Sequence, residues 1–261
     1  MQISLIITTY NRPDALLLVL ESIERQSKLP KQVIIADDGS NVKTSELISV
    51  FKSNSSFKLL HSFQIDEGFR AARSRNLAIS KANSDYIILI DGDMILHQNF
   101  IHDHEKRAQT GYFVQGTRVL LSQNKTKSIF KTRDFVFNFL SQGLINRKNA
   151  IYSNFLSSIF SINKNYLRGI KTCNIAFYRK DFISVNGFNN KFEGWGREDS
   201  EFGVRLMNKG IKRKTLRFNA IQYHLWHPED SREFLEENER LLERAIDEKL
   251  KWCKSGINEF L

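Results

Sequence analysis

Cysteine and proline are both scarce in this sequence, which contains two Cys and three Pro among 261 residues. Cys173 and Cys253 lie far apart and form no Cys-x-x-Cys pair, so a disulfide framework and a cysteine zinc site are both poorly supported. The composition, with 41% hydrophobic and 26% charged residues, is that of a globular protein rather than a disordered one. We therefore expect one large domain or two small ones with a full hydrophobic core.

Long apolar runs and glycine-rich phosphate-binding motifs are missing as well. No apolar run approaches the roughly 20 residues that span a bilayer. The residues after Met1 lack the basic start and small-residue cleavage site of a signal peptide, so we expect a cytoplasmic protein. Neither GxGxxG nor GxxxxGKS/T occurs, so a nucleotide would bind without a glycine-rich phosphate cradle.

Positive charge is concentrated in one central segment. Residues 106–180 contain 14 Lys or Arg and a single acid, Asp134, whereas the whole chain has a net charge of +10. The remainder is therefore slightly acidic. Such a segment could bind the phosphates of nucleic acid, anionic lipid or a phosphorylated glycan. Apolar residues recur at spacings of three and four between 129 and 160, which predicts amphipathic helices.

Two interpretations of these helices stay open. Their apolar face docks on an anionic membrane or receives a lipid-linked acceptor, or it packs on the rest of the protein while the charges are solvated. Basic residues interleaved with aromatics also occur in platforms for single-stranded nucleic acid. Because no RNA-binding motif accompanies them, no nucleic-acid partner is expected.

Strand-forming apolar runs alternate with helical patterns in the first half of the chain. Asn11 and Pro13 are typical of a helix start, as its cap and its first-turn residue. The order of strand, helix and strand indicates right-handed βαβ units and a parallel sheet. Strands are predicted at 3–8, 32–36, 57–62 and 86–90, and helices from 13, over 71–79 and over 99–109.

Carboxylates stand at the ends of two predicted strands, in Asp37-Asp38-Gly39 and in Asp91-Gly92-Asp93. Ligands of open α/β sheets collect outside the carboxyl ends of the strands. Aspartates there supply hard oxygen ligands for a divalent cation that bridges to phosphate oxygens. A solvated turn would use the same residue types, so this pattern alone leaves both interpretations open.

The second half of the chain adds an aromatic, two acids and two histidines. Trp195 lies between two glycines and offers a flat apolar surface for a sugar, ahead of Glu198 and Asp199 at a predicted helix start. A helix N-terminus favours acids even without a functional role. His224 and His227 follow predicted strands at 172–177 and 220–223, and imidazoles can complete the coordination of a metal. A capping arrangement of Asp230 with residue 233 precedes a predicted packing helix over 234–250.

Taken in order, these segments resemble the inverting family 2 glycosyltransferases with the GT-A fold. The matching motifs of the first half are Thr8-Thr9-Tyr10-Asn11-Arg12-Pro13, Ala36-Asp37-Asp38-Gly39-Ser40 and Ile90-Asp91-Gly92-Asp93. Gly187-Phe188-Asn189 and the run from Phe192 to Asp199 are similar to the C-terminal half of β-1,4-galactosyltransferases and bacterial chondroitin-type polymerases. The resemblance extends from Ile3 to about Asp230.

The resemblance implies an α/β fold with a Rossmann-like, mostly parallel sheet flanked by helices, a basic helical insertion and a C-terminal helix. The implied regions are a nucleotide-sugar-binding half at 1–116, the basic insertion at 117–170, an acceptor-binding and catalytic half at 171–228 and the C-terminal helix at 229–261. The family often has a second glycine where this chain has Arg197, and some members have an acid at Ser200, so the identity of the acceptor stays open.

The resemblance also implies a role for each motif residue. The residues matched to the donor are Thr8, Tyr10 and Asp38 at the uracil, Arg70 or Arg73 at the diphosphate, and Asp91 with Gly92 near the ribose. Asp93 matches a metal ligand, with His227 and, as a second choice, His224 completing the site for Mn²⁺ or, alternatively, Mg²⁺. Asp199 matches the catalytic base, and Gly194, Trp195 and Glu198 match acceptor-binding positions.

The implied function is transfer of a sugar from a UDP-sugar, by single displacement, to a hydroxyl of a glycan or lipid-linked glycan acceptor. Bacterial lipopolysaccharide or capsule synthesis at the inner face of the plasma membrane is the expected setting. Two other interpretations remain. A hydrolase with paired carboxylates would need no nucleotide, and a non-catalytic module that binds anionic glycan or nucleic acid through residues 106–180 would show steep salt dependence.

Overall fold

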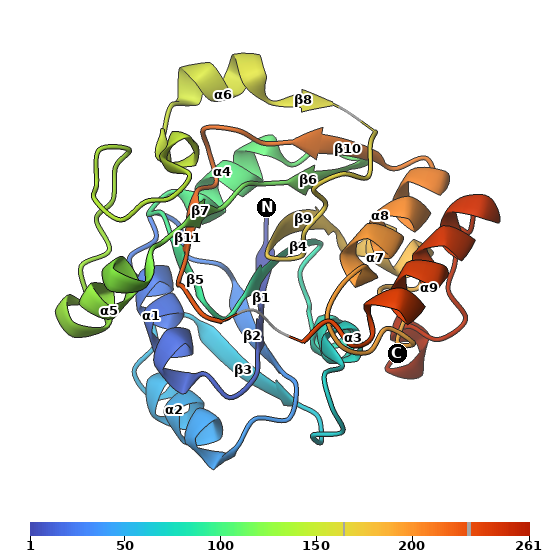
Figure 1. Ribbon diagram of the computed structural model, residues 1–261, viewed down its shortest axis with the longest axis horizontal. Coiled ribbons are helices and arrows are strands. Elements are labelled where there is room, and N and C mark those ends of the chain that lie inside the picture. The colour runs from blue at the N-terminus through green and yellow to red at the C-terminus, as the bar shows by residue number, and fades with distance from the viewer. Residues whose placement is uncertain (164, 229–230) are drawn as a thin grey trace.

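The computed structural model describes residues 1–163, 165–228 and 231–261 (Figure 1). The strands are β1 (Ile3–Thr9), β2 (Gln32–Asp37), β3 (Lys58–Phe63), β4 (Tyr86–Asp91), β5 (Met94–Leu96), β6 (Tyr112–Gln115), β7 (Val119–Leu120), β8 (Ile162–Asn163), β9 (Asn174–Tyr178), β10 (Lys212–Thr215) and β11 (Gln222–His224). The helices are α1 (Pro13–Glu24), α2 (Val42–Lys52), α3 (Ala71–Ser80), α4 (Phe100–Arg107), α5 (Gln123–Thr132), α6 (Asn154–Phe160), α7 (Arg179–Ser184), α8 (Glu198–Asn208) and α9 (Leu235–Asp247), with 3-10 turns η1 (Arg147–Ala150) and η2 (Ile257–Glu259).

The central sheet has the strand order β3-β2-β1-β4-β9-β6-β10-β8. Its first four strands are parallel, and β9 runs antiparallel to both β4 and β6. A smaller sheet has the order β5-β11-β7. The register aligns Thr8 of β1 with Asp91 of β4 and with Ala36 of β2. The ends of the parallel strands therefore deliver the predicted donor motifs to one edge of the sheet.

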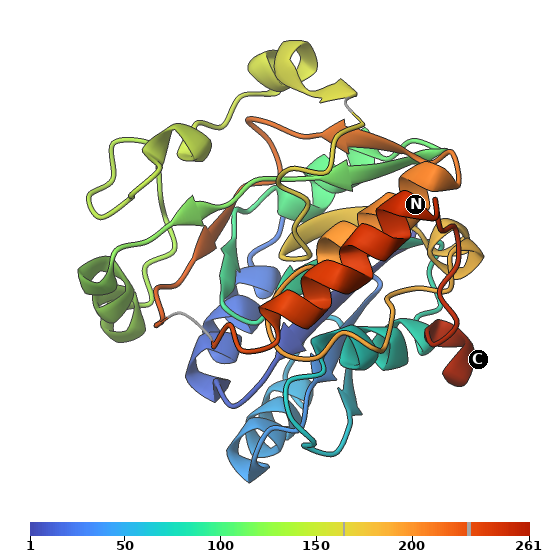
Figure 2. The same ribbon diagram turned by 45° about the vertical axis from the view of Figure 1, so that its right-hand side comes forward.

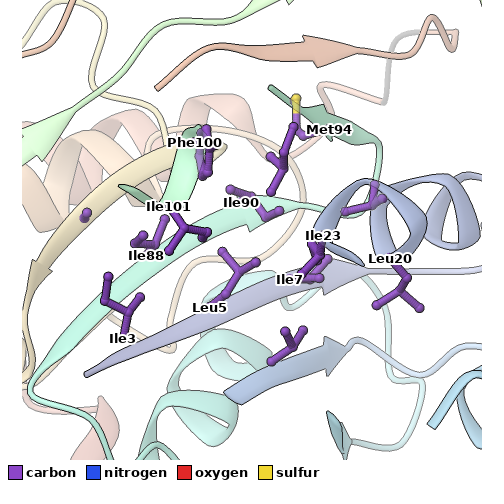
Figure 3. Packing of buried hydrophobic residues seen from close by; sticks show 14 of the residues in the cluster. Ile3, Leu5, Ile7, Leu20, Ile23, Ile88, Ile90, Met94, Phe100 and Ile101 are labelled. Carbon is purple, nitrogen blue, oxygen red and sulfur yellow. The ribbon is translucent and has the colours of Figure 1, made fainter. Parts of the chain in front are cut away.

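Alternate residues of the central strands face two layers of helices, as the two-residue period of a strand requires. Leu5 and Ile7 of β1 pack into a core that includes Leu20 and Ile23 of α1 (Figure 3). Ile6 packs into the opposite core with α3, α7 and α8. Figure 1 shows α1 and α2 on one side of the parallel strands and α3, α7, α8 and α9 on the other. Strands β1, β2 and β4 are buried on both faces, which explains their nearly continuous apolar runs.

Several local predictions needed correction. The strand predicted at 172–177 is Asn174–Tyr178, and the helix predicted over 99–109 is Phe100–Arg107. Asn11 does not cap α1: its φ is +50° and its side chain accepts from the Asn41 N–H at 2.8 Å, while Arg12 stands at the cap position. The third strand is Lys58–Phe63 rather than 57–62. The last strand begins at Gln222 rather than at Ala220, because the φ of +47° at Ala220 is incompatible with extended backbone.

The basic segment is less helical than its apolar spacing predicts, since irregular chain with Gly143 at φ +80° separates α5 from α6. Ile129, Phe137 and Leu144 pack against α1 and β11, as the packing interpretation requires. A second set of large apolar side chains is exposed. We call these the outer apolar residues: Val136, Phe139, Leu140, Ile145, Phe155, Ile159 and Phe160.

The last helix packs where the apolar stripe predicts. Leu242 and Ala245 of α9 contact Val204 of α8, and Figure 2 shows α9 lying along α8. The helix begins at Leu235, and Asp230 of the predicted capping arrangement lies outside the described residues. No helix in the described part of the chain is long and apolar enough to cross a membrane.

Phe202 anchors α8, the helix that begins with Glu198 and Asp199. Its fully buried ring lies 4.5 Å from the ring centre of Phe188 and 5.3 Å from that of Phe182. We expect Phe202→Ala to lower the free energy of unfolding by about 3–5 kcal/mol, because it leaves a cavity among these rings. Chemical denaturation measures this loss. The matched control, Phe155→Ala on the exposed face of α6, should change stability by less than about 0.5 kcal/mol, and similar losses in both variants would contradict this packing.

Candidate active site

One cleft of about 1080 Å³ lies at the carboxyl ends of β1, β2 and β4. This volume is at the upper limit of ligand pockets, roughly 300–1,000 Å³. The residues predicted from sequence that line it are Thr8, Tyr10, Asp38, Asp91, Gly92, Asp93, Gly194, Trp195, Glu198, Asp199, His224 and His227. Segments almost 220 residues apart in the sequence thus meet in one place.

Gly92, which follows β4, connects the end of β4 to the end of β1. Its N–H donates to the Thr8 carbonyl at 2.7 Å. A Cβ at this position would lie 2.9 Å from that carbonyl oxygen, so the close approach of the two strand ends requires glycine. The aspartates on either side are therefore held at fixed positions on the sheet edge.

Asp93, His224 and His227 form a compact cluster whose ligand atoms all lie within 4.8 Å of one another. The Asp93 Oδ2 is 3.5 Å from His224 Nε2 and 3.3 Å from His227 Nε2. Antiparallel pairing of β11 with β5 holds the two segments together, and the Leu225 N–H donates to the Asp93 carbonyl at 3.0 Å. The cluster joins residues 131 positions apart in the sequence into one potential metal site.

The chemistry of this cluster fits a divalent cation. The Asp93 Oδ1 is buried and has no hydrogen-bond partner among the described residues, which is costly unless something else satisfies it. Burial disfavours ionisation of Asp93, but His224, His227 and the Arg12 guanidinium at 2.9 Å together lower its pKa below the ordinary value. One carboxylate and two imidazoles with open coordination positions suit first-row transition metals.

Asp38 and Tyr10 also line the cleft. Asp38 is buried and accepts hydrogen bonds from the Gln64 side chain and from the Arg70 N–H at 2.8 Å. Burial raises its pKa to about 6, against the opposing effect of these two bonds. Tyr10 is 43% exposed, and its hydroxyl donates to Asp66 Oδ2 at 2.9 Å. An exposed ring beside a carboxyl group that is held in place suits a planar base with an N–H donor.

Neither Arg70 nor Arg73 reaches this cleft with its guanidinium. Arg70 forms an ion pair with Glu67 and donates to the Ile65 carbonyl at 3.0 Å. Arg73 donates to Gln64 Oε1 at 2.8 Å. Both residues are absent from the cleft lining in the described part of the chain, so the geometry does not support the predicted diphosphate contact for either one.

The arginine that does line the cleft is Arg75, which the sequence reasoning missed. Its buried guanidinium lies 2.9 Å from Glu198 Oε1 and 3.5 Å from Asp91 Oδ1, and its Nε donates to Thr8 Oγ1 at 3.0 Å. Burial alone would lower the pKa of Arg75, but Glu198 and Asp91 raise it. A signal was present in the sequence, because this arginine stands four residues after Ala71 on the apolar stripe of α3.

The loop before α8 turns through three residues in the left-handed region, with φ of +66° at Gly194, +107° at Gly196 and +75° at Arg197. A Cβ on Gly194 would come within 2.5 Å of Phe234, so this position requires glycine. Arg197 adopts this conformation although it has a side chain, and it forms an ion pair with Glu239. This turn places both acids at the start of α8 in the cleft lining.

Asp199 accepts hydrogen bonds from the Ser200 N–H at 2.6 Å and the Ser200 hydroxyl at 3.1 Å. Burial and the neighbouring charge of Glu198 raise its pKa to about 7, against these bonds and the charge of Arg75. A carboxyl group with such a pKa can accept a proton near neutral pH. Its neighbour Glu198 is held by Arg75, so the two acids have different environments.

Comparison with known proteins identifies the family. The model described as glycosyl transferase family 2 matches residues 4–184, which is more than half of the chain. A model described as the N-terminal domain of galactosyltransferase matches residues 156–228. The chain belongs to glycosyl transferase family 2 and is a glycosyltransferase by family, which confirms the resemblance inferred from the ordered motifs.

The relatives are larger proteins. Chondroitin synthase of Escherichia coli is 27% identical over 85% of this chain and 34% of its own length. Hyaluronan synthase of Pasteurella multocida is 27% identical over 85% of this chain and 24% of its own length. The chain thus spans about a third of the length of the first of these curated relatives and about a quarter of the length of the second. S. aureus TarS 1–349 in complex with UDP has a TM-score of 0.62 at 16% identity, covering 93% of this chain and 64% of that one. This likeness confirms the predicted fold.

Removing the Asp93 carboxylate should weaken binding of Mn²⁺ by at least about tenfold, since loss even of groups that only support a ligand costs 10–100-fold. Electron paramagnetic resonance of free Mn²⁺ during a titration of Asp93→Ala measures this. The control Asp14→Ala removes an exposed acid from α1 and should bind as the intact chain does. Unchanged affinity in both Asp93→Ala and His227→Ala would contradict this metal site.

Proposed function

We propose that this chain transfers a sugar from a UDP-sugar to a hydroxyl of a glycan acceptor, with inversion at the anomeric carbon. The observation that carries the proposal is that Asp199, with a pKa raised to about 7, shares one cleft with the Asp93–His224–His227 cluster and with Asp38. A base, a site for a cation and a pocket for a nucleobase are the parts that such a transfer needs.

Two related observations support UDP as the nucleotide. TarS, which shares the fold, has been solved with UDP and with UDP-GlcNAc. In this chain Tyr10 would stack on the uracil and Asp38 would accept from its ring N–H, while Thr8 closes the pocket beside them. Asp91 and Gly92 lie on the same sheet edge and are assigned to the ribose side. Donors with glucose, galactose or their N-acetyl forms differ by single groups and all fit this scheme.

Asp93, His227 and His224 would hold the divalent cation, and Mn²⁺ suits this mixed oxygen and imidazole donor set better than Mg²⁺. The cation would supply Lewis-acid stabilisation of negative charge on the diphosphate. The Arg12 guanidinium lies 2.9 Å from Asp93 Oδ2 and adds positive charge beside this cation site. Asp93 is kept ionised there, as a metal ligand must be.

The chemical step centres on Asp199. Its carboxylate takes the proton from the acceptor hydroxyl as that oxygen attacks the anomeric carbon. The new bond joins the acceptor oxygen to this carbon, and the bond from the carbon to the diphosphate oxygen breaks with its electron pair leaving on UDP. Trp195 presents an apolar ring to the acceptor and Glu198, fixed by Arg75, accepts from a neighbouring hydroxyl. Attack on the face opposite the leaving group inverts the configuration.

The acceptor is a bacterial surface glycan, of the lipopolysaccharide or capsule type, carried on a lipid. Support comes from the relatives, which include chondroitin, hyaluronan and poly-β-1,6-N-acetyl-D-glucosamine synthases of bacteria. A lipid carrier would place the enzyme at the cytoplasmic face of the membrane. The outer apolar residues supply a contact, because they lie within the basic segment and are exposed. In Figures 1 and 2, α6 and the chain before it lie on the same side of the molecule, away from the C-terminal helices.

Asp199→Asn should lower the rate of sugar transfer by about 10²–10⁴, because the amide cannot accept the proton. Affinity for UDP, measured by thermal shift, should stay unchanged. The control Asp247→Asn removes an exposed acid at the end of α9 and should leave both quantities unchanged. A collapse of UDP affinity in Asp199→Asn would show that Asp199 serves the donor site rather than the base.

The raised pKa of Asp199 gives this reaction a specific pH dependence. Because the base must be ionised, kcat/KM should rise about tenfold per pH unit up to about pH 7 and level off above it. A plateau that already begins below pH 5 would exclude a base with this pKa.

Binding to anionic vesicles tests the membrane contact. We expect co-sedimentation with vesicles containing phosphatidylglycerol but not with neutral phosphatidylcholine, and loss of binding at high salt. Phe155→Asp and Leu140→Asp, at side chains 71% and 68% exposed, should abolish it without changing stability. The matched control is Val50→Asp on α2, which is also 68% exposed. Vesicle binding that survives in both variants would contradict this surface.

A further inference from the structure

The cations that line the cleft differ in whether an acid neutralises them. Arg12 lies 2.9 Å from Asp93, Arg75 lies 2.9 Å from Glu198, and Arg197 forms an ion pair with Glu239. Arg118 and Lys171 also line the cleft. Neither forms an ion pair with any residue in the described ranges. The charge of Arg118 acts on Asp91 only through space, where it opposes the effect of burial on the pKa of that carboxyl group, so both cations keep their donors for a ligand.

The backbone that carries Lys171 is held firmly by Gln115 at the end of β6. The Gln115 amide nitrogen donates to the Lys171 carbonyl at 3.1 Å, and its amide oxygen accepts from the Lys171 N–H at 3.0 Å. The Gln115 side chain thus satisfies both backbone groups of Lys171, as a neighbouring strand would. Although the side chain of Lys171 is exposed, its point of attachment is therefore fixed beside the cleft.

The backbone that carries Arg118 is held by three asparagines. The Arg118 carbonyl accepts from the side chains of Asn146 and Asn149, each at 3.0 Å. The preceding Thr117 carbonyl accepts from Asn174 at 2.8 Å. A Cβ on Gly116 would lie 2.4 Å from the Asn174 side chain, so this approach requires glycine. Arg118 thus extends into the cleft from a rigid support.

The orientation of Asn174 is itself determined by a buried histidine. His104 Nε2 is 2.9 Å from the Asn174 amide oxygen, and burial lowers the pKa of His104 to about 4. The imidazole is therefore neutral at physiological pH, and its Nε2–H donates to that oxygen. The Asn174 nitrogen then points to the carbonyls of Thr117 and Ala220. Fully buried groups thus position a half-buried cation, an arrangement typical of a binding site.

The side chain that the Arg118 guanidinium contacts is not a counter-ion. Arg118 Nη1 lies 3.8 Å from the Cys173 sulfur. Burial raises the pKa of this thiol to about 12, despite the charges of Arg118 and Lys171. The thiol is therefore neutral and does not compensate the charge of Arg118. The N–H donors of the Arg118 guanidinium can then bind an external anion. A planar fork of N–H donors matches carboxylate or phosphate oxygens in pairs.

We propose that Arg118 and Lys171 form a subsite for an anionic substituent, a carboxylate or a phosphate, on the sugar substrate that occupies the cleft. This inference rests on the proposed function, because it concerns a substrate of the same cleft. The anion belongs either to the donated sugar or to the acceptor, and Arg118 would bind the same anionic group in both cases. Neutral sugars would leave the two cations without a partner and would bind more weakly.

Equilibrium binding, measured by calorimetry, tests the subsite without relying on catalysis. In the acceptor arm, the chain saturated with UDP and Mn²⁺ is titrated with methyl β-D-glucuronide, glucose 6-phosphate and neutral methyl β-D-glucoside. In the donor arm, UDP-glucuronic acid is compared with UDP-glucose. We expect an anionic probe to bind at least about tenfold more tightly than its neutral counterpart in one arm, and that arm identifies the source of the anion.

Substitutions connect this preference to the two cations. Arg118→Gln should abolish the preference and Lys171→Gln should reduce it, with affinity for UDP unchanged in both. Arg118→Lys keeps the charge without the fork and should retain part of the preference. The matched control, Lys127→Gln, removes an exposed charge of the same segment outside the cleft and should leave the preference intact. Equal melting temperatures confirm that the variants are folded.

Three results would overturn the subsite. The first is that the intact chain shows no preference for the anionic probe in either arm. The second is that the preference survives in both glutamine variants. The third is that Arg118→Gln lowers the affinity for UDP itself, which would make the diphosphate the partner of Arg118. Failure of the proposed function looks different, because UDP would then bind to no form of the chain, whatever the charge at Arg118.

Discussion

A single buried guanidinium joins the two halves of the cleft. Arg75 comes from α3, and its contacts reach Thr8 at the end of β1, Asp91 at the end of β4 and Glu198 at the start of α8. Removing one partner from such a cluster leaves an uncompensated buried charge, which typically costs about 3–5 kcal/mol. The relative positions of Thr8, Asp91 and Glu198 in the cleft therefore depend on this interaction.

The same interaction explains how one cleft holds several carboxylates in different states. Arg75 offsets the charges of Glu198 and Asp91, while Arg12 and the two histidines keep Asp93 ionised. Asp199 forms no ion pair within the described ranges, and burial beside Glu198 raises its pKa. The pKa of Asp93, beside its cations, is therefore lowered, whereas the pKa of Asp199, which lacks an ion pair there, is raised. Different environments thus give neighbouring carboxylates separate tasks.

The sequence predicted those features that depend on local patterns. Apolar runs located β1, β2 and β4, acids followed the last two of these strands, and the glycines around Trp195 indicated the turn into α8. Features that depend on distant contacts were missed. Arg75 looked like an ordinary helical residue because its partners lie up to 123 positions away. Asn11 looked like a helix cap because its bonds to residues 40 and 41 cross between loops, and only the fold brings those loops together.

In the function proposed above, the cleft binds UDP through a cation held by Asp93. A thermal-shift titration with UDP, with and without Mn²⁺, on the intact chain and on Asp93→Ala tests it directly. A ligand that binds only the folded state raises the apparent stability once its concentration exceeds the dissociation constant. We expect stabilisation of the intact chain by UDP only with Mn²⁺, and none in the variant. Absence of any shift with UDP, or an equal shift in the variant, would contradict cation-dependent binding of UDP at this cleft.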